Sequence, residues 1–165
     1  MLWSIDECSG AGGRRLEQRR VLASDFFNRV WELLELPERT REQDDEMLHS
    51  AHASRALWAG VGTLANLARG EWQCSRVYAV LRRPEPALWH ARRSLELCEQ
   101  AEPGILADFD LPFAFEALAR AHAVAGAREA AMNWLERAAD AALRIADADD
   151  REQVATDLRD VRRLL

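Results

Sequence analysis

The sequence contains no lysine: all 22 basic residues are arginine, and they are outnumbered by 28 aspartate and glutamate residues. The formal net charge of -6 argues against a nucleic-acid-binding protein, because a protein that grips the phosphate backbone usually carries an excess of basic side chains. The exclusive use of arginine, together with 29 alanines, is typical of a protein encoded by a GC-rich genome. The number of arginines therefore carries little functional weight by itself.

Cysteines and long apolar runs are also scarce. Cys8, Cys74 and Cys98 are an odd, widely spaced set without a C-x-x-C motif, which predicts neither a disulfide framework nor a thiolate metal site. The first residues, MLWSIDECSGAGGRR, lack the apolar stretch of about 7 to 15 residues found in a signal peptide. No run approaches the roughly 18 apolar residues that a membrane helix needs. We expect a cytoplasmic protein without a membrane partner.

Apolar residues recur at helical spacing, and prolines, glycines and capping residues divide the chain into segments. The predicted helices cover 16–36, 40–60, 63–83, 84–102, 110–125, 127–147 and 149–164. Thr40 with Gln43 predicts a capping box, and Asp149 with Glu152 predicts a similar start for the last helix. No segment alternates with a period of two, so the fold class is all-α. Residues 1–15 are expected to form a flexible leader before a single domain of residues 16–165.

Two segments of the chain repeat each other at an offset of 44 residues. They are SRVYAVLRRPEPALWHARRSLEL (75 to 97) and ARAHAVAGAREAAMNWLERAADA (119 to 141). The alignment pairs Ser75 with Ala119, Tyr78 with His122, Arg82 with Gly126, Ala87 with Ala131, and Ala91 with Leu135. The earlier segment MLHSAHASRALW aligns more loosely with ALWHARRSLELC. A unit of two helices is therefore repeated along the chain.

The order of small, aromatic, turn and bulky residues resembles the tetratricopeptide repeat, and the chain is similar to a group of small bacterial tetratricopeptide-like proteins. The resemblance implies a superhelical stack of about three antiparallel helical hairpins, closed by a C-terminal capping helix. Arg82 at the turn glycine and Ala91 at a bulky position depart from the pattern. The spacing of 44 residues also exceeds the usual spacing of about 34, as in longer-repeat variants of the family.

The resemblance also implies a concave face on which a protein or peptide partner binds. The family's groove positions fall on Arg69, Trp72, Gln73, Arg76, Phe113, Glu116 and Arg120. Spacing agrees for the first four, which share one helical stripe. Two arginines flanking Trp72 predict a grip on a carboxylate and stacking against its flat neighbour. In the alternative interpretation, Trp72 packs in the core and the arginines pair with glutamates or solvent.

The second predicted helix carries a possible metal-binding face. Glu46 and His49 form a Glu-x-x-His pair, and Asp45, His49 and His52 lie on one face of the helix. A di-iron bundle requires two such motifs and two further glutamates, whereas the chain contains only one Glu-x-x-His. We expect these histidines to make surface or inter-helix polar contacts; a metal site of Asp45, His49 and His52 is the alternative.

Catalytic patterns are weaker still. Cys98 and His90 lie two turns apart on one predicted helix without a third group to orient a base, and the early glycines follow no predicted strand. We expect a non-enzymatic interaction module without a cofactor, whose partner is a protein or peptide. The alternatives are a regulator or carrier of a small anionic ligand, and then a metal-dependent enzyme using His49 and His52. The acidic, alanine-rich face of the second helix makes homo-oligomerisation plausible.

Overall fold

The computed structural model describes residues 9–165, which fold into helices without any strand, so the all-α prediction is confirmed for this range. The helices are α1 (Ser9–Leu34), α2 (Arg41–Trp58), α3 (Leu64–Val80), α4 (Pro84–Gln100), α5 (Asp110–Val124), α6 (Arg128–Ala142) and α7 (Ala148–Arg162). Among these described residues, no helix has both the length and the apolar character needed to cross a membrane.

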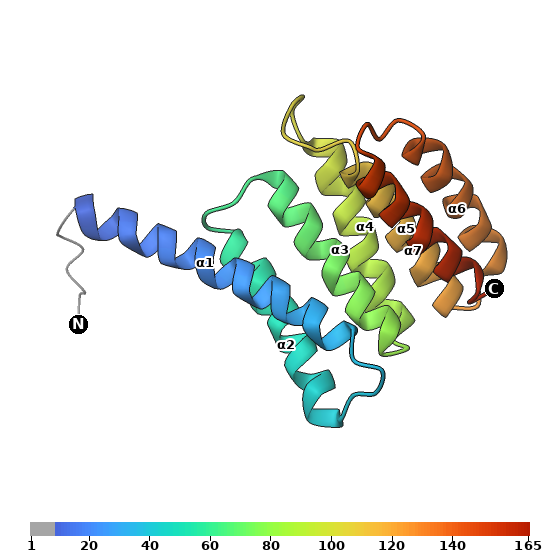
Figure 1. Ribbon diagram of the computed structural model, residues 1–165, viewed down its shortest axis with the longest axis horizontal. Helices are drawn as coiled ribbons and strands as arrows, with labels where there is room; N and C mark the ends of the chain where they lie inside the picture. Colours follow the sequence, from blue (N-terminus) through green and yellow to red (C-terminus); the bar gives the residue numbers. More distant parts are fainter. Residues whose placement is uncertain (1–8) are drawn as a thin grey trace.

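Successive helices pack as three hairpins, α1–α2, α3–α4 and α5–α6, and α7 covers the last of them (Figure 1). The first helices of the second and third hairpins, α3 and α5, lie side by side, whereas α1 touches α3 at only a few points. The N-terminal half of α1 extends away from the stack. The predicted stack with a C-terminal capping helix is thus observed, and it is open between α1 and α3.

Local sequence explains most of the helix ends. Thr40 accepts a hydrogen bond from the Gln43 amide, and the Gln43 side chain accepts one from the Thr40 amide, which confirms the predicted capping box. The cap of α7 is Asp147, whose carboxylate accepts bonds from two amides of the first turn, so the start predicted at Asp149 is wrong by two residues. The helix α1 begins at Ser9, inside the predicted leader; residues 1–8 lie outside the described residues.

The turn that joins the two helices of a hairpin has the same geometry in the second and third hairpins. Arg82 and Gly126 both have a left-handed backbone, with φ of 56° and 73°. The amide that follows each residue donates to a carbonyl five residues earlier, Arg83 to Tyr78 and Ala127 to His122, both at 2.9 Å. The offset of 44 residues therefore holds in three dimensions, and the arginine adopts the conformation of the glycine it replaces.

The apolar core is divided between the hairpins. Val30, Leu33, Met47 and Val77 join the first two hairpins. Phe115, Leu135, Ile145, Val154, Leu158 and Val161 join the third hairpin to α7, whose three members of this set recur at helical spacing. Leu22 and Phe26 continue the helical spacing of apolar residues along α1 toward its N-terminus, but both are exposed. The core of α1 is therefore confined to its C-terminal half.

Candidate functional site

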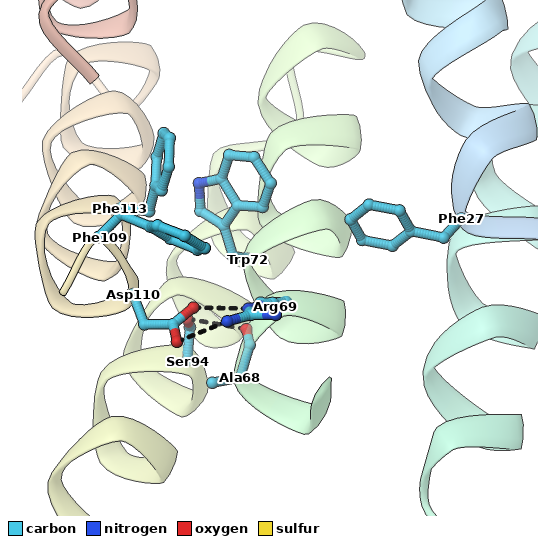
Figure 2. Close-up of a pocket in the computed structure, with 8 residues that line it drawn as sticks. All are labelled: Phe27, Ala68, Arg69, Trp72, Ser94, Phe109, Asp110 and Phe113. Atoms are coloured by element: carbon cyan, nitrogen blue, oxygen red, sulfur yellow. Dashed lines mark hydrogen bonds and ion pairs between the residues drawn. The ribbon is translucent and has the colours of Figure 1, made fainter. Parts of the chain in front are cut away.

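The gap between α1 and α3 contains an apolar hollow of about 200 Å³, which we call the aromatic pocket. Its walls are Phe27, Ala68, Arg69, Trp72, Ser94, Phe109, Asp110 and Phe113. Figure 2 shows Phe27 pointing from α1 across the gap toward Trp72, with Phe109 and Phe113 on the opposite wall. The Trp72 and Phe113 ring centroids are 4.9 Å apart, and those of Phe109 and Phe113 are 6.0 Å apart.

The floor of the aromatic pocket is an ion pair between Arg69 and Asp110 (Figure 2). Two guanidinium nitrogens of Arg69 donate to the two carboxylate oxygens of Asp110 at 2.6 and 2.9 Å. Asp110 is buried and also accepts a bond from the Ala107 amide at 2.8 Å. These bonds and the negative charge of Asp110 raise the pKa of Arg69, although burial opposes its charge. The floor is polar but has no net charge.

Two further hollows continue the aromatic pocket in opposite directions along α3. One is lined by Ser24, Phe27, Asn28, Trp58, Asn66 and Arg69. The other, of about 510 Å³, is lined by Trp31, Leu34, Glu35, Trp72, Arg76, Val80, Arg120 and Gln153. Neighbouring hollows share Phe27, Arg69 or Trp72, so they adjoin one another, and we call the three together the α1–α3 groove. Along α3 it runs from Asn66 to Val80, roughly 20 Å at the helical rise per residue.

Arg76 stands at one end of this groove and is bound to the capping helix. It donates two hydrogen bonds to Asp157 at 2.8 and 2.9 Å, and its guanidinium lies 5.3 Å from the centre of the Trp31 ring. The side chain of Arg76 is 15% exposed and that of Asp157 is 3% exposed. Burial works against the charge of Arg76, but the bonds to Asp157 and nearby acidic charges raise its pKa overall. Arg76 therefore holds α7 against α3.

Arg120 and Trp72 share a second buried carboxylate, that of Glu116. Arg120 Nε donates to Glu116 Oε1 at 2.6 Å, and Trp72 Nε1 donates to Glu116 Oε2 at 3.0 Å. A second guanidinium nitrogen of Arg120 also lies 3.9 Å from Asp157 Oδ1. The three arginines of the predicted binding face thus already hold carboxylates of the same chain.

The structure brings the predicted groove residues together but changes the role of several. Gln73 and Glu116 are fully buried, so they support the groove from beneath. Gln73 Nε2 donates to the Phe27 carbonyl at 2.9 Å, and its Oε1 is a buried atom without a hydrogen-bond partner in the described chain. Arg76 and Arg120 were predicted to line a binding face, but each is already paired with a buried carboxylate: Arg120 pairs with Glu116, as the alternative interpretation expects, and the half-buried Arg76 pairs with Asp157.

Phe27, Trp31 and Asp110 line the groove and Asp157 binds Arg76, but none of these four residues was predicted from the sequence as part of the site. One signal was available for Asp157, since it lies among the apolar residues Val154, Leu158 and Val161 on the inner face of α7. An acidic side chain in an apolar stripe is expected to have a buried partner. Its partner Arg76 is 81 residues away in the sequence, and no local pattern identifies it.

A second cluster lies on the other side of α3, at the junction of α2, α3 and α4. One ring nitrogen each of His52 and His90 and the sulfur of Cys74 all lie within 4.8 Å of one another. Cys74 and His90 are buried and His52 is half-buried. Burial raises the pKa of the Cys74 thiol to about 12, and it lowers the pKa of His52, helped by the nearby His90. We call these three residues the thiol–imidazole cluster.

Hydrogen-bond partners orient both histidines. His90 Nδ1 lies 2.6 Å from Glu71 Oε2, while Arg55 Nε donates to the other oxygen of Glu71 at 2.8 Å. Burial opposes the charge of Glu71, but these bonds lower its pKa overall. Gly70 makes the approach of Arg55 possible, because a Cβ at this position would lie 2.8 Å from Arg55 Cδ.

His52 Nε2 lies 2.9 Å from the Tyr78 hydroxyl. The predicted metal-binding face of Asp45, His49 and His52 is not what the structure assembles, since Asp45 and His49 are exposed. Within the described residues, the thiol–imidazole cluster is the one group of three or more such side chains with the proximity that a metal ion requires. His52 is therefore the member of the predicted face that has buried partners.

Comparison with known proteins adds no assignment to either site: the sequence matches no protein-family model and shows no significant similarity to a curated protein. The α1–α3 groove offers an apolar pocket with polar extensions, which suits recognition of a flexible chain. The thiol–imidazole cluster offers nitrogen and sulfur atoms, which suit a metal ion.

Proposed function

We propose that the protein is a non-catalytic interaction module of the tetratricopeptide type, which binds an extended peptide segment of a partner protein in the α1–α3 groove. An apolar side chain of that segment, aromatic or leucine, would occupy the aromatic pocket. The observation that carries the proposal is this pocket, which is walled by Phe27, Trp72, Phe109 and Phe113 and open to the groove. Aromatic-lined pockets that fully desolvate one side chain are typical hot spots of recognition.

The size of the aromatic pocket favours a single side chain over a whole metabolite. Its volume of about 200 Å³ is below the range of about 300 to 1,000 Å³ typical of small-molecule sites. The groove length of roughly 20 Å matches about six residues of extended chain, at about 3.3 Å per residue. Side chains of Asn28 and Asn66 line the groove on one side of the pocket, and amide groups of this kind can bond to a peptide backbone.

A small anionic ligand remains the second candidate, and the hollow beside Arg76 supports it. Its volume of about 510 Å³ suits a metabolite. However, Arg76 and Arg120 are already paired with Asp157 and Glu116, and Glu35 adds a further negative charge to the wall. An anion would have to displace a buried carboxylate from its arginine, which is costly. The neutral, apolar anchor is therefore the better-supported occupant.

A random-peptide library selected on the immobilised full chain tests the proposal. We expect enrichment of peptides with one aromatic or leucine anchor, and binding of the enriched peptide that falls tenfold or more in Phe27→Ala. Loss of one buried aromatic contact is worth about 1.5 to 3 kcal/mol, and about 1.4 kcal/mol corresponds to tenfold in affinity. Phe26→Ala is the matched control, because Phe26 is the exposed neighbour outside the groove.

The outcomes separate the candidate functions. Equal binding by Phe27→Ala and Phe26→Ala, or no enrichment of any peptide, would overturn the peptide proposal. Enrichment of acidic peptides whose affinity falls steeply with salt would favour the anion-binding alternative instead. Thermal melting of both variants shows whether an effect of Phe27→Ala on binding arises from loss of the fold.

A further inference from the structure

We propose that His52, Cys74 and His90 form a binding site for one zinc ion, held between α2, α3 and α4. This site lies outside the α1–α3 groove, so the inference does not depend on the proposed peptide binding. Each helix contributes one ligand, and the three ligand atoms already lie within 4.8 Å of one another. Zinc–nitrogen bonds of about 2.0 to 2.1 Å and zinc–sulfur bonds of about 2.3 Å require only a modest inward shift of these side chains.

The surroundings of His90 are those of a metal-bound histidine. Such a histidine almost always donates its second ring N–H to a carboxylate or carbonyl, which fixes its orientation. His90 Nδ1 is bound in this way to Glu71, 2.6 Å away, and Arg55 holds the same carboxylate. Nε2 of His90 takes no part in that bond. The Arg55–Glu71–His90 chain therefore supplies the outer support that a zinc ligand needs.

His52 and its neighbours complete the site. One of its ring nitrogens is bound to the Tyr78 hydroxyl, which leaves a second nitrogen outside that bond. Burial favours the neutral ring of His52, the form that coordinates a cation. Because His52 is only half-buried while Cys74 is fully enclosed, an ion would enter from the α2 side. A water molecule on that side would supply the fourth tetrahedral ligand.

The third hairpin shows that packing alone does not require this cluster. At the offset of 44 residues, Glu71 corresponds to Phe115, Cys74 to Leu118, and His90 to Trp134. Phe115 and Trp134 pack against each other with ring centroids 5.6 Å apart and ring planes tilted by 32°, and Leu118 is buried. The same helical framework is thus filled by apolar side chains in one hairpin and by a carboxylate, a thiol and an imidazole in the other.

The donor set selects the ion. Two imidazoles and one thiolate in a tetrahedral arrangement favour zinc over magnesium or calcium, which prefer oxygen ligands. Binding forms a zinc–sulfur bond and releases the thiol proton of Cys74 to solvent, without any oxidation or reduction. Bound zinc would tie the first two hairpins together through α2, α3 and α4.

Titration of the purified, metal-free full chain with cobalt(II), a spectroscopic substitute for zinc, tests the site. We expect one ion per chain with the absorption of tetrahedral thiolate coordination, displaced by zinc, together with a higher melting temperature that a chelator reverses. Cys74→Ser should remove the thiolate absorption and weaken binding tenfold or more. His52→Ala should weaken binding similarly, because it removes a second ligand.

Two matched controls make the test specific. Cys98→Ser removes the other buried free thiol among residues 9–165, and burial likewise raises its pKa to about 12. His49→Ala removes an exposed histidine of the same helix as His52. Both controls should bind cobalt like the unmodified chain. Absence of thiolate absorption in the unmodified chain, or its persistence in Cys74→Ser, would overturn the proposal. Circular dichroism of each variant ensures that a lost signal reflects a lost ligand in a folded chain.

Discussion

The second and third hairpins have the same backbone design but opposite interiors. In α3–α4, the interface contains the Glu71–His90 pair, and the hydroxyls of Ser75 and Ser94 donate to carbonyls of the facing helix. In α5–α6, the positions equivalent to the serines are Ala119 and Ala138, both buried. Small residues at the helix crossing are common to both hairpins, so the fold requires them. The polar side chains of the interior are present in only one hairpin, so the fold does not require them.

The polar interior of the second hairpin carries a cost that the third avoids. A buried ion pair gains little over well-packed apolar residues, because both charges lose their hydration. The buried carboxylate of Glu71 nevertheless keeps two polar partners, the Arg55 guanidinium and the His90 ring. Such an arrangement is expected at sites where selection acts on chemistry as well as on stability. The two hairpins therefore identify the thiol–imidazole cluster as the region to test for function.

The largest expected effect concerns the third hairpin and its cover. Leu158→Asp should destabilise the chain by more than about 3 kcal/mol, because it puts a charge into an apolar cluster without a partner. Leu158 is 7% exposed and belongs to the cluster formed with Phe115 and Leu135. Urea unfolding measures the change, and hydrogen exchange should show α5–α6 losing protection before α3–α4.

Arg159→Ala is the control for that substitution, since Arg159 is exposed on the same helix and its side chain makes only surface contacts, with Glu152 and Thr156. It should change stability by less than about 1 kcal/mol. If Leu158→Asp leaves the unfolding midpoint unchanged, α7 does not cover the third hairpin in solution.

The second prediction tests the polar interior. Glu71→Gln should cost about 1.5 to 3 kcal/mol, the usual value of hydrogen bonds to a charged group, because Arg55 and His90 would share a neutral amide. Glu96→Gln on α4 is the matched control, as its pair with Arg93 is at the surface. Chemical denaturation in the presence of a chelator measures both variants without any metal contribution. Equal stability of the two variants would show that the buried pair contributes no more than the surface pair.

Local signals were enough to predict the repeated hairpins but not the two sites. Helix starts and turns depend on neighbours along the chain, so helical periodicity, the cap at Thr40, the proline at Pro84 and the 44-residue offset were enough to predict them. The structure has these helix starts and turns. The pairs Arg69–Asp110 and Arg76–Asp157 join residues 41 and 81 positions apart. Such pairs depend on which helices face one another, so the sequence left open whether the arginines of the predicted binding face are paired and did not identify Asp110 or Asp157 as partners.

The cysteines illustrate the same limit. The absence of C-x-x-C spacing argued against a thiolate metal site, because that motif places two ligands on one local segment. In the structure, Cys74 instead meets histidines from two other helices. A site with one ligand per helix has no short spacing that could mark it. The predicted metal-binding face contains only one member of this cluster, His52, because the prediction used the spacing of residues along a single helix.

The third prediction compares the two hairpin turns. Gly126→Ala should destabilise the chain by about 1 to 2 kcal/mol, the cost of a left-handed backbone for a residue with a Cβ. No atom lies within 4 Å of a Cβ built on Gly126, so this cost is conformational and not steric. Arg82→Gly should do the opposite and stabilise by less than about 1 kcal/mol, because glycine also gains freedom in the unfolded chain. Thermal melts of the two variants check the signs; shifts of the same sign would contradict the equivalence of the turns.

The smallest effect is expected from a substitution that gives one hairpin a residue of the other. His122→Tyr gives the third hairpin the residue that the second has at Tyr78, and it removes a half-buried ring whose pKa is lowered by burial and by Arg92. Because the ring binds its proton less readily when folded, the unfolded chain takes up more protons as the pH falls below about 6.5, so the unmodified chain loses stability there. Tyrosine does not titrate in this range, so His122→Tyr should show a shallower loss between pH 7.5 and pH 5. Urea unfolding across this range measures the difference, which is small because the ring is partly screened by solvent. Parallel curves for the two proteins would show that His122 titrates alike in the folded and unfolded chains.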